Sequence, residues 1–162
     1  MSSRIYISGA LIGSENLIVA RSKYESCAVI LRNAGYEPYL PHQNTDPDLK
    51  PDKAMQDVFL DDVQALMSSD AVVAFLDEPS HGVGAEVAIC IARKVPIIAL
   101  VQSNVRVSRF ILGMIEKGER STVVVYSDTS ELADILPKKV SEAIRLKRDN
   151  NEDGLTALLR RV

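Results

Sequence analysis

The chain has 162 residues, of which 46% are hydrophobic and 25% charged, a composition typical of one soluble globular domain with one core. No apolar run is long enough to cross a membrane, and the first residues, MSSRIYISGA, lack the long apolar core of a signal peptide, so we predict a cytoplasmic protein. The net charge is -3, without a cluster of Lys and Arg on one predicted face, which argues against nucleic acid as a partner.

Strands and helices are predicted to alternate along the whole chain. Short apolar runs predict strands at 4–8, 36–40, 70–76, 96–101 and 122–126. Helical patterns predict helices at 15–33, at 54–68, between the third and fourth strands, and at 105–115, followed by a charged helical tail from about residue 128 that is interrupted by Pro137. A turn at 9–14 and a polar loop at 41–53 connect the earlier elements.

The predicted strands are apolar throughout rather than alternating between apolar and polar residues. Such strands belong to a parallel sheet that helices cover on both faces. We therefore predict a doubly wound α/β fold, with a five-stranded parallel sheet in the flavodoxin-like order 2-1-3-4-5, forming a single domain over residues 1–162. Ligands bind such sheets at the carboxyl ends of the strands where the order reverses. The turns SGALIGS, after the first strand, and DEPSHGVGAE, after the third, are expected to meet there.

Glu86 is a candidate nucleophile because it follows Gly82 and Gly84 at the start of a predicted helix. A carboxylate in the first helical turn is favoured in its ionised form by the helix dipole. The two glycines leave the backbone open to a ligand, and a fixed, partly desolvated carboxylate can attack an electrophilic carbon. The alternative is an ordinary acid in the first turn of a helix.

Asp62 is a candidate general acid because it falls within an apolar stripe of the predicted second helix. Met55, Val58, Phe59 and Leu66 form that stripe, whereas other acids of the helix lie on a solvated face. Burial raises the pKa of a carboxyl group, and a carboxyl that keeps its proton near neutral pH can donate it. The alternative is a buried acid that caps a loop or pairs with an arginine.

Other residues of the two turns could support a ligand. Tyr6 lies in the first strand, within reach of the crevice, unless it is simply a core aromatic residue. Ser8, Gly9 and Ser80 offer hydroxyl or backbone N–H groups to an anion or a sugar, although Ser80 could equally cap the following helix. An acid and a nucleophile at one bond are the requirements of glycosidic cleavage, including that of an N-glycosidic bond.

Motifs of other chemistries are absent from the sequence, which has no P-loop, no G-x-G-x-x-G fingerprint and no G-x-S-x-G elbow. Cys27 and Cys90 are expected to be core residues. His42 and His81 lie in separate loops without the spacing of metal ligands, so we expect no metal and no cofactor.

Three segments, IYISGALIG, LDDVQALMSSDAVVAFL and PSHGVGAEVAICIARKVPII, resemble the nucleoside 2-deoxyribosyltransferase superfamily over residues 4–126. Within it the chain is most similar to the 2'-deoxynucleoside 5'-phosphate N-hydrolases. The resemblance implies that Glu86 is the nucleophile, that Asp62 assists base departure and that Tyr6 orients Glu86. It also implies that Ser80 tolerates a 5'-phosphate, where the transferases carry an aspartate, and that Ser108 reaches that phosphate across a dimer interface.

The chain departs from the family pattern at several positions. Ile12 replaces an arginine of the hydrolases, so that Arg106 or Arg109 would have to supply the positive charge for a phosphate. The sequence ends in RRV rather than in the aromatic residue of the transferases, which counts against a transferase. Gln43 and Asn44 either read a base or shape turns.

We therefore predict a hydrolase that cleaves the N-glycosidic bond of 2'-deoxynucleoside 5'-monophosphates through a covalent glycosyl intermediate on Glu86, and that forms a homodimer or a larger homo-oligomer. Two alternatives remain at this stage. One is a transferase that exchanges bases between deoxynucleosides, and the other is a nucleotide-binding module without catalysis. A small nucleoside or nucleotide is the expected ligand in all three cases.

Overall fold

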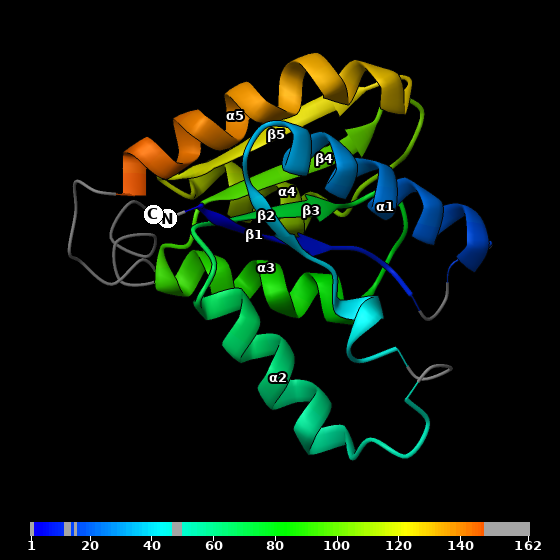
Figure 1. Cartoon of the computed structure of the whole chain (residues 1–162). Coiled ribbons are helices and arrows are strands. Elements are labelled where there is room, and N and C mark those ends of the chain that lie inside the picture. The colour runs from blue at the N-terminus through cyan, green and yellow to red at the C-terminus, as the bar shows by residue number, and fades with distance from the viewer. Residues whose placement is uncertain (1, 12–13, 15, 47–49, 148–162) are drawn as a thin grey trace.

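The computed structural model describes residues 2–11, 14, 16–46 and 50–147 (Figure 1). Its strands are β1 (Arg4–Ser8), β2 (Glu37–Tyr39), β3 (Ala71–Phe75), β4 (Ile97–Gln102) and β5 (Ser121–Tyr126). Its α-helices are α1 (Leu17–Asn33), α2 (Met55–Met67), α3 (His81–Arg93), α4 (Arg109–Lys117) and α5 (Leu132–Lys147). Two short 3₁₀ helices, η1 (Pro41–Gln43) and η2 (Thr129–Glu131), complete the described elements.

The strands form one parallel sheet in the order β2-β1-β3-β4-β5, which confirms the predicted topology. The order reverses beside β1, because the chain moves from β1 to β2 on one side and to β3 on the other. The carboxyl ends of β1 and β3 therefore define the crevice in which this fold class holds its ligands.

Helices cover both faces of the sheet, as the apolar strands predict. The helices α1 and α5 pack together on one face, whereas α3 and α4 cover the other and α2 lies against α3 (Figure 1). Each face has its own hydrophobic cluster, to which alternate residues of the central strands contribute. Within the described residues, no helix is both long and apolar enough to span a membrane.

Alternation along β1 determines which of its side chains face the crevice. Ile5 and Ile7 join the cluster beneath α1 and α5, whereas Tyr6 joins the cluster beneath α3. Successive side chains of a strand point to opposite faces, so Ser8 follows Tyr6 toward α3. Two hydroxyl groups from one strand thus face the helix that carries Glu86.

Two elements near the C-terminal end differ from their predictions. The helix α4 begins at Arg109, not near residue 105, because residues 105–108 are not helical. The α5 helix runs through Pro137 without interruption. It is no solvated tail, since Leu132, Leu136 and Val140 are buried against the α1 side of the sheet. This apolar stripe stabilises the helix despite the N–H group that Pro137 lacks.

Apart from the start of α3, the remaining boundaries agree closely with the sequence. Asn16 caps α1 by accepting a hydrogen bond from the backbone N–H of Val19, and Gly35, with φ of 85°, follows the helix where the stop signal was predicted. Cys27 and Cys90 are free and buried, as expected of core residues.

Candidate active site

Glu86 lies in the second turn of α3, not in the first turn as predicted. The helix begins at His81, and Ser80 is its N-cap, with its side chain accepting a hydrogen bond from the backbone N–H of Val83 at 3.4 Å. The effect of the helix dipole falls off within the first turn, so it cannot be the main reason for ionisation of Glu86. The sequence predicted a later start of this helix, because glycines such as Gly82 and Gly84 favour a turn. Both glycines are helical in the structure.

Two hydroxyl groups of β1 bind the Glu86 carboxylate instead. Tyr6 donates to Oε1 at 2.6 Å, and Ser8 donates to Oε2. Hydroxyl-to-carboxylate bonds of this kind are charge-assisted and fix the direction of the acceptor. Burial raises the pKa of Glu86, while the bonds from Ser8 and Tyr6 act in the opposite direction. The two hydroxyls thus partly offset the effect of burial on the pKa of this carboxyl group.

Asp62 points into the crevice from α2, but the apolar stripe around it is only partly buried. Leu66 is fully buried, whereas Met55 and Phe59 are 89% and 59% exposed. The stripe was expected to be buried along its length, and this expectation is wrong. The reason is tertiary, because the N-terminal half of α2 extends away from the sheet (Figure 1).

The pKa of Asp62 is raised, as predicted, and burial is the largest cause. Thr45 and Lys53 oppose the shift, and Asp61 adds to it. The Thr45 hydroxyl lies 3.1 and 3.2 Å from the two carboxyl oxygens of Asp62. No arginine pairs with Asp62 among the described residues, so the arginine-pair alternative does not apply there.

Glu86 and Asp62 line one cavity of about 360 Å³. The other lining residues are Gly9, Leu11, Pro41, Thr45, Val58, Ser80, His81, Gly82 and Val83. Asp62 also contributes to the raised pKa of Glu86, as expected for two acids that are near each other. The sequence predicted opposed pKa pressures on the two acids, but burial raises the pKa of both. They differ in their hydrogen bonds, since Glu86 accepts from two hydroxyls and Asp62 from one.

A second cavity of about 440 Å³ adjoins the first, because Ser80, His81 and Val83 line both. Ser108 and Arg106 line the second cavity, whereas Arg109 is not among its lining residues. Ser80 and Ser108 of one chain thus line the same cavity. Of the two arginines that could supply a positive charge for a phosphate, Arg106 lines this cavity and Arg109 does not.

The three predicted glycines have different roles. A Cβ at Gly9 would lie 2.2 Å from the ring of Tyr24, so packing of this ring requires glycine at that position. A Cβ at Gly82 or Gly84 would meet no atom closer than 3.8 Å. Gly82 lines the first cavity and Gly84 the second, so both leave room at the places predicted for a ligand.

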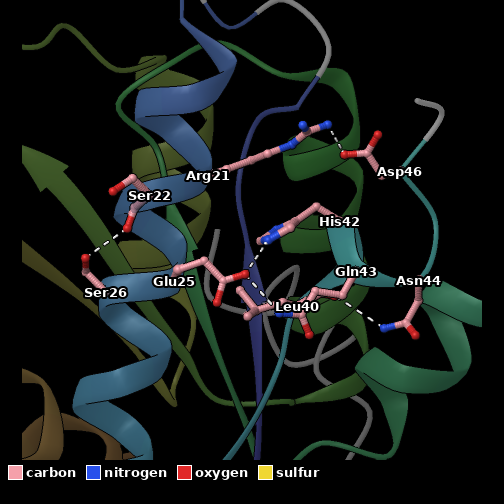
Figure 2. A network of polar contacts seen from close by, with 9 residues as sticks. All are labelled: Arg21, Ser22, Glu25, Ser26, Leu40, His42, Gln43, Asn44 and Asp46. Atoms are coloured by element: carbon pink, nitrogen blue, oxygen red, sulfur yellow. Dashed lines mark hydrogen bonds and ion pairs between the residues drawn. The ribbon is translucent and has the colours of Figure 1, made fainter. Parts of the chain in front are cut away.

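The segment of residues 41–46 follows β2 and lies along α1 (Figure 2). The polar contacts that hold it there are His42 with Glu25 (2.8 Å), Gln43 with Glu25 (2.9 Å), and the Arg21–Asp46 ion pair. Asn44 donates to the carbonyl of Leu40 at 3.4 Å. These contacts favour a structural role for Gln43 and Asn44, which line a different hollow from that of Glu86.

Sequence reasoning missed two hydrogen-bonding roles, those of Ser8 toward Glu86 and of Thr45 toward Asp62. The first could have been found, because Ser8 shares the face of β1 with Tyr6. No sequence signal indicates the second.

Ile12 and the terminal residues 160–162, on which two of the sequence predictions rest, lie outside the described residues. In the part of the chain that the structure describes, no three His, Cys, Asp or Glu residues form a group that could hold a metal ion.

Comparison with known proteins identifies the family of the chain. The family model described as nucleoside 2-deoxyribosyltransferase matches residues 5–143. A Methanosarcina mazei protein named "Putative 2'-deoxynucleoside 5'-phosphate N-hydrolase 1" is 32% identical over 112 residues, which cover 67% of each chain. A protein of the same name from Thermofilum pendens is 26% identical over 147 residues, covering 89% of this chain and 99% of the relative. The enzyme class predicted from the sequence, an N-glycosidase of this superfamily, agrees with these names.

Solved structures with the same fold have lower sequence identity. A CMP N-glycosidase from Clostridium botulinum superposes with a TM-score of 0.65 at 17% identity, covering 82% of this chain and 96% of its own. A 2-deoxyribosyltransferase from Bacillus psychrosaccharolyticus superposes with a TM-score of 0.60 at 16% identity, covering 82% and 91%. At these identities, the superpositions support the fold.

Proposed function

Because the chain belongs to the nucleoside 2-deoxyribosyltransferase family, we propose that it hydrolyses the N-glycosidic bond of 2'-deoxynucleoside 5'-monophosphates. The observation that carries this proposal is the presence of Glu86 and Asp62 in the lining of one cavity. The names of the relatives support the choice of substrate and of hydrolysis over transfer. The covalent intermediate is part of the proposal and rests on the fixed position of Glu86.

In the proposed mechanism, a Glu86 carboxylate oxygen attacks C1' of the deoxyribose while the bond from C1' to the base nitrogen breaks. Asp62 transfers its proton to the departing base, so that the base leaves neutral. Tyr6 and Ser8 hold the carboxylate in line for the attack. A water molecule then attacks C1' of the glycosyl ester and gives a proton to the Asp62 carboxylate, while the bond from C1' to Glu86 breaks. This step releases the sugar phosphate and restores the Glu86 carboxylate and the protonated Asp62.

The raised pKa values suit both roles. A carboxylate whose pKa is raised by burial is a better nucleophile once it is ionised, because it is less stabilised by solvent. A carboxyl group with a raised pKa retains its proton closer to neutral pH. The reaction therefore needs Glu86 ionised and Asp62 protonated in the same complex.

The proposed place for the 5'-phosphate is the second cavity, between Ser80, Ser108 and Arg106. Two hydroxyls and a guanidinium suit a phosphate dianion. Glu78 also lines this cavity and opposes an anion there. We expect Arg106→Gln to lower kcat/KM for the monophosphate more than for the nucleoside. Glu78→Gln should instead raise kcat/KM for the monophosphate more than for the nucleoside.

The test is a base-release assay on each 2'-deoxynucleoside and its 5'-monophosphate, with free base measured by chromatography for the wild type and for Glu86→Ala. The proposal requires base release by the wild type and not by the variant. Formation of a new nucleoside after addition of a second base would indicate a transferase. Tight nucleotide binding without turnover, unchanged by Glu86→Gln, would indicate a binding module.

We also propose that the protein is a cytoplasmic homodimer. Two large apolar side chains four positions apart on α2, Met55 and Phe59, are 89% and 59% exposed, and residues four apart lie on the same face of a helix. Contiguous exposed apolar patches mark interaction sites in soluble proteins, and a second copy of the chain is the partner we propose. Light scattering after size-exclusion chromatography should give twice the mass of one chain, and Phe59→Glu should reduce it.

A further inference from the structure

The Thr45 hydroxyl lies between two different acceptors. Its Oγ1 is 3.0 Å from the carbonyl oxygen of Pro41 and 3.1 and 3.2 Å from the carboxyl oxygens of Asp62. Thr45 is 7% exposed, so water has little access to its hydroxyl, whereas Asp62 is half-buried and lines the cavity. A threonine hydroxyl has one proton and can donate to one acceptor at a time, while its lone pairs accept. The state of Asp62 therefore determines the direction of the Thr45 proton.

The Pro41 carbonyl is the weaker competitor for this proton. It already accepts the backbone N–H groups of Asn44 and Thr45, each at 2.8 Å, and a carbonyl has two lone pairs. An ionised Asp62 therefore takes the hydroxyl proton, because a charge-assisted bond is stronger than a neutral one. When Asp62 is protonated, its own O–H can point to Thr45 while Thr45 donates to Pro41.

We propose that Thr45 is a positioning residue that orients the protonated Asp62 carboxyl and stabilises the carboxylate formed when the proton leaves. This inference rests on the proposed function, in which Asp62 is the general acid. The Asp62 proton moves to the base nitrogen as the glycosidic bond breaks. Thr45 keeps its own proton and turns it from the Pro41 carbonyl to the new carboxylate.

The anchorage of Thr45 is independent of the helix that carries Asp62. The 41–46 segment is tied to α1 by the contacts of His42, Gln43 and Asp46 with Glu25 and Arg21 (Figure 2). The N-terminal half of α2 is largely exposed, and no side chain caps this helix. Asp62 lies just beyond this exposed half, and its hydrogen bonds within the described residues come from the anchored Thr45.

Other charged groups also affect the pKa of Asp62 and therefore the pH dependence of the reaction. Lys53 lowers the pKa of Asp62, and Asp61 raises it, while Glu86 lies across the cavity. The hydrogen bond from Thr45 also lowers this pKa. Removal of the hydroxyl should therefore make Asp62 a weaker acid and move the alkaline limb of its pH profile to higher pH.

The experiment compares Thr45→Val, which removes the hydroxyl, with Thr45→Ser, which retains it, and with Thr122→Val on β5 as a matched control. Each enzyme is assayed on 2'-deoxyguanosine 5'-monophosphate and on its 7-methylated form. The methylated base is already cationic and leaves without taking a proton. Loss of a positioned general acid should therefore affect the first substrate and not the second.

We expect Thr45→Val to lower kcat/KM for the unmethylated nucleotide about 10- to 100-fold and to change the methylated one by less than about threefold. Thr45→Ser and Thr122→Val should stay near wild type, and the alkaline limb should move upward in Thr45→Val alone. Equal losses on both substrates would assign Thr45 a purely structural role, and no loss on either would remove it from the mechanism. A wild type that releases base from none of the 2'-deoxynucleoside 5'-monophosphates would contradict the proposed function itself.

Discussion

Replacement of Tyr6 by Phe tests whether hydroxyl groups control the ionisation of Glu86. The substitution removes one donor, at 2.6 Å from Oε1, and leaves the Ser8 donor in place. A hydrogen bond to a charged group contributes about 1.5–3 kcal/mol. One pKa unit corresponds to about 1.4 kcal/mol, so the pKa of Glu86 should rise by about one to two units.

The sign of the effect on activity follows from the role of Glu86. The nucleophile must be ionised, so the acid limb of kcat/KM should move to higher pH by the same one to two units, with activity recovered as the pH rises. The assay is base release from a deoxynucleoside monophosphate between pH 4 and 9. The control is Tyr126→Phe, which removes a buried hydroxyl that donates to Asp77 instead. A uniform loss of rate without movement of the acid limb would refute the reasoning.

Three further predictions concern stability and the cavity. The raised pKa of Glu86 means that the folded protein loses stability as pH rises through that pKa. Glu86→Gln should therefore raise the free energy of unfolding more at pH 7.5 than at pH 5, as measured by thermal melting, and an equal gain at both pH values would contradict this. Gly9→Ala should cost about 1–3 kcal/mol in urea unfolding, because its Cβ would lie 2.2 Å from the Tyr24 ring, and an unchanged midpoint would be the opposing result. The Cβ that Gly82→Ala adds would have one near neighbour, Ser80 Oγ at 3.8 Å, so this variant should retain its stability. Its methyl group would lie at the cavity wall and should raise KM, and an unaltered KM would exclude a ligand there.

The sequence by itself was sufficient to predict the sheet order, the crevice and the two acids. Parallel topology follows from apolar strands that alternate with helices, and both patterns are local properties of the chain. Glu86 and Asp62 stand out because acids are rare among apolar neighbours, a feature visible without coordinates. The alternation of β1 also implies that Tyr6 and Ser8 share one face, although only Tyr6 was interpreted as a partner of Glu86.

Only the tertiary structure decided the environment of these groups. The partners of Glu86 are some 80 positions distant in the sequence, and Thr45 reaches Asp62 from a loop without a recognisable pattern. The exposure of Met55 and Phe59 depends on where α2 leaves the sheet, and the burial of α5 depends on α1 beside it. Hydrogen bonding and desolvation depend on neighbours in space, whereas periodicity depends on neighbours along the chain. The sequence pattern therefore located the two acids, but not the hydrogen-bond donors and the burial that set their pKa values.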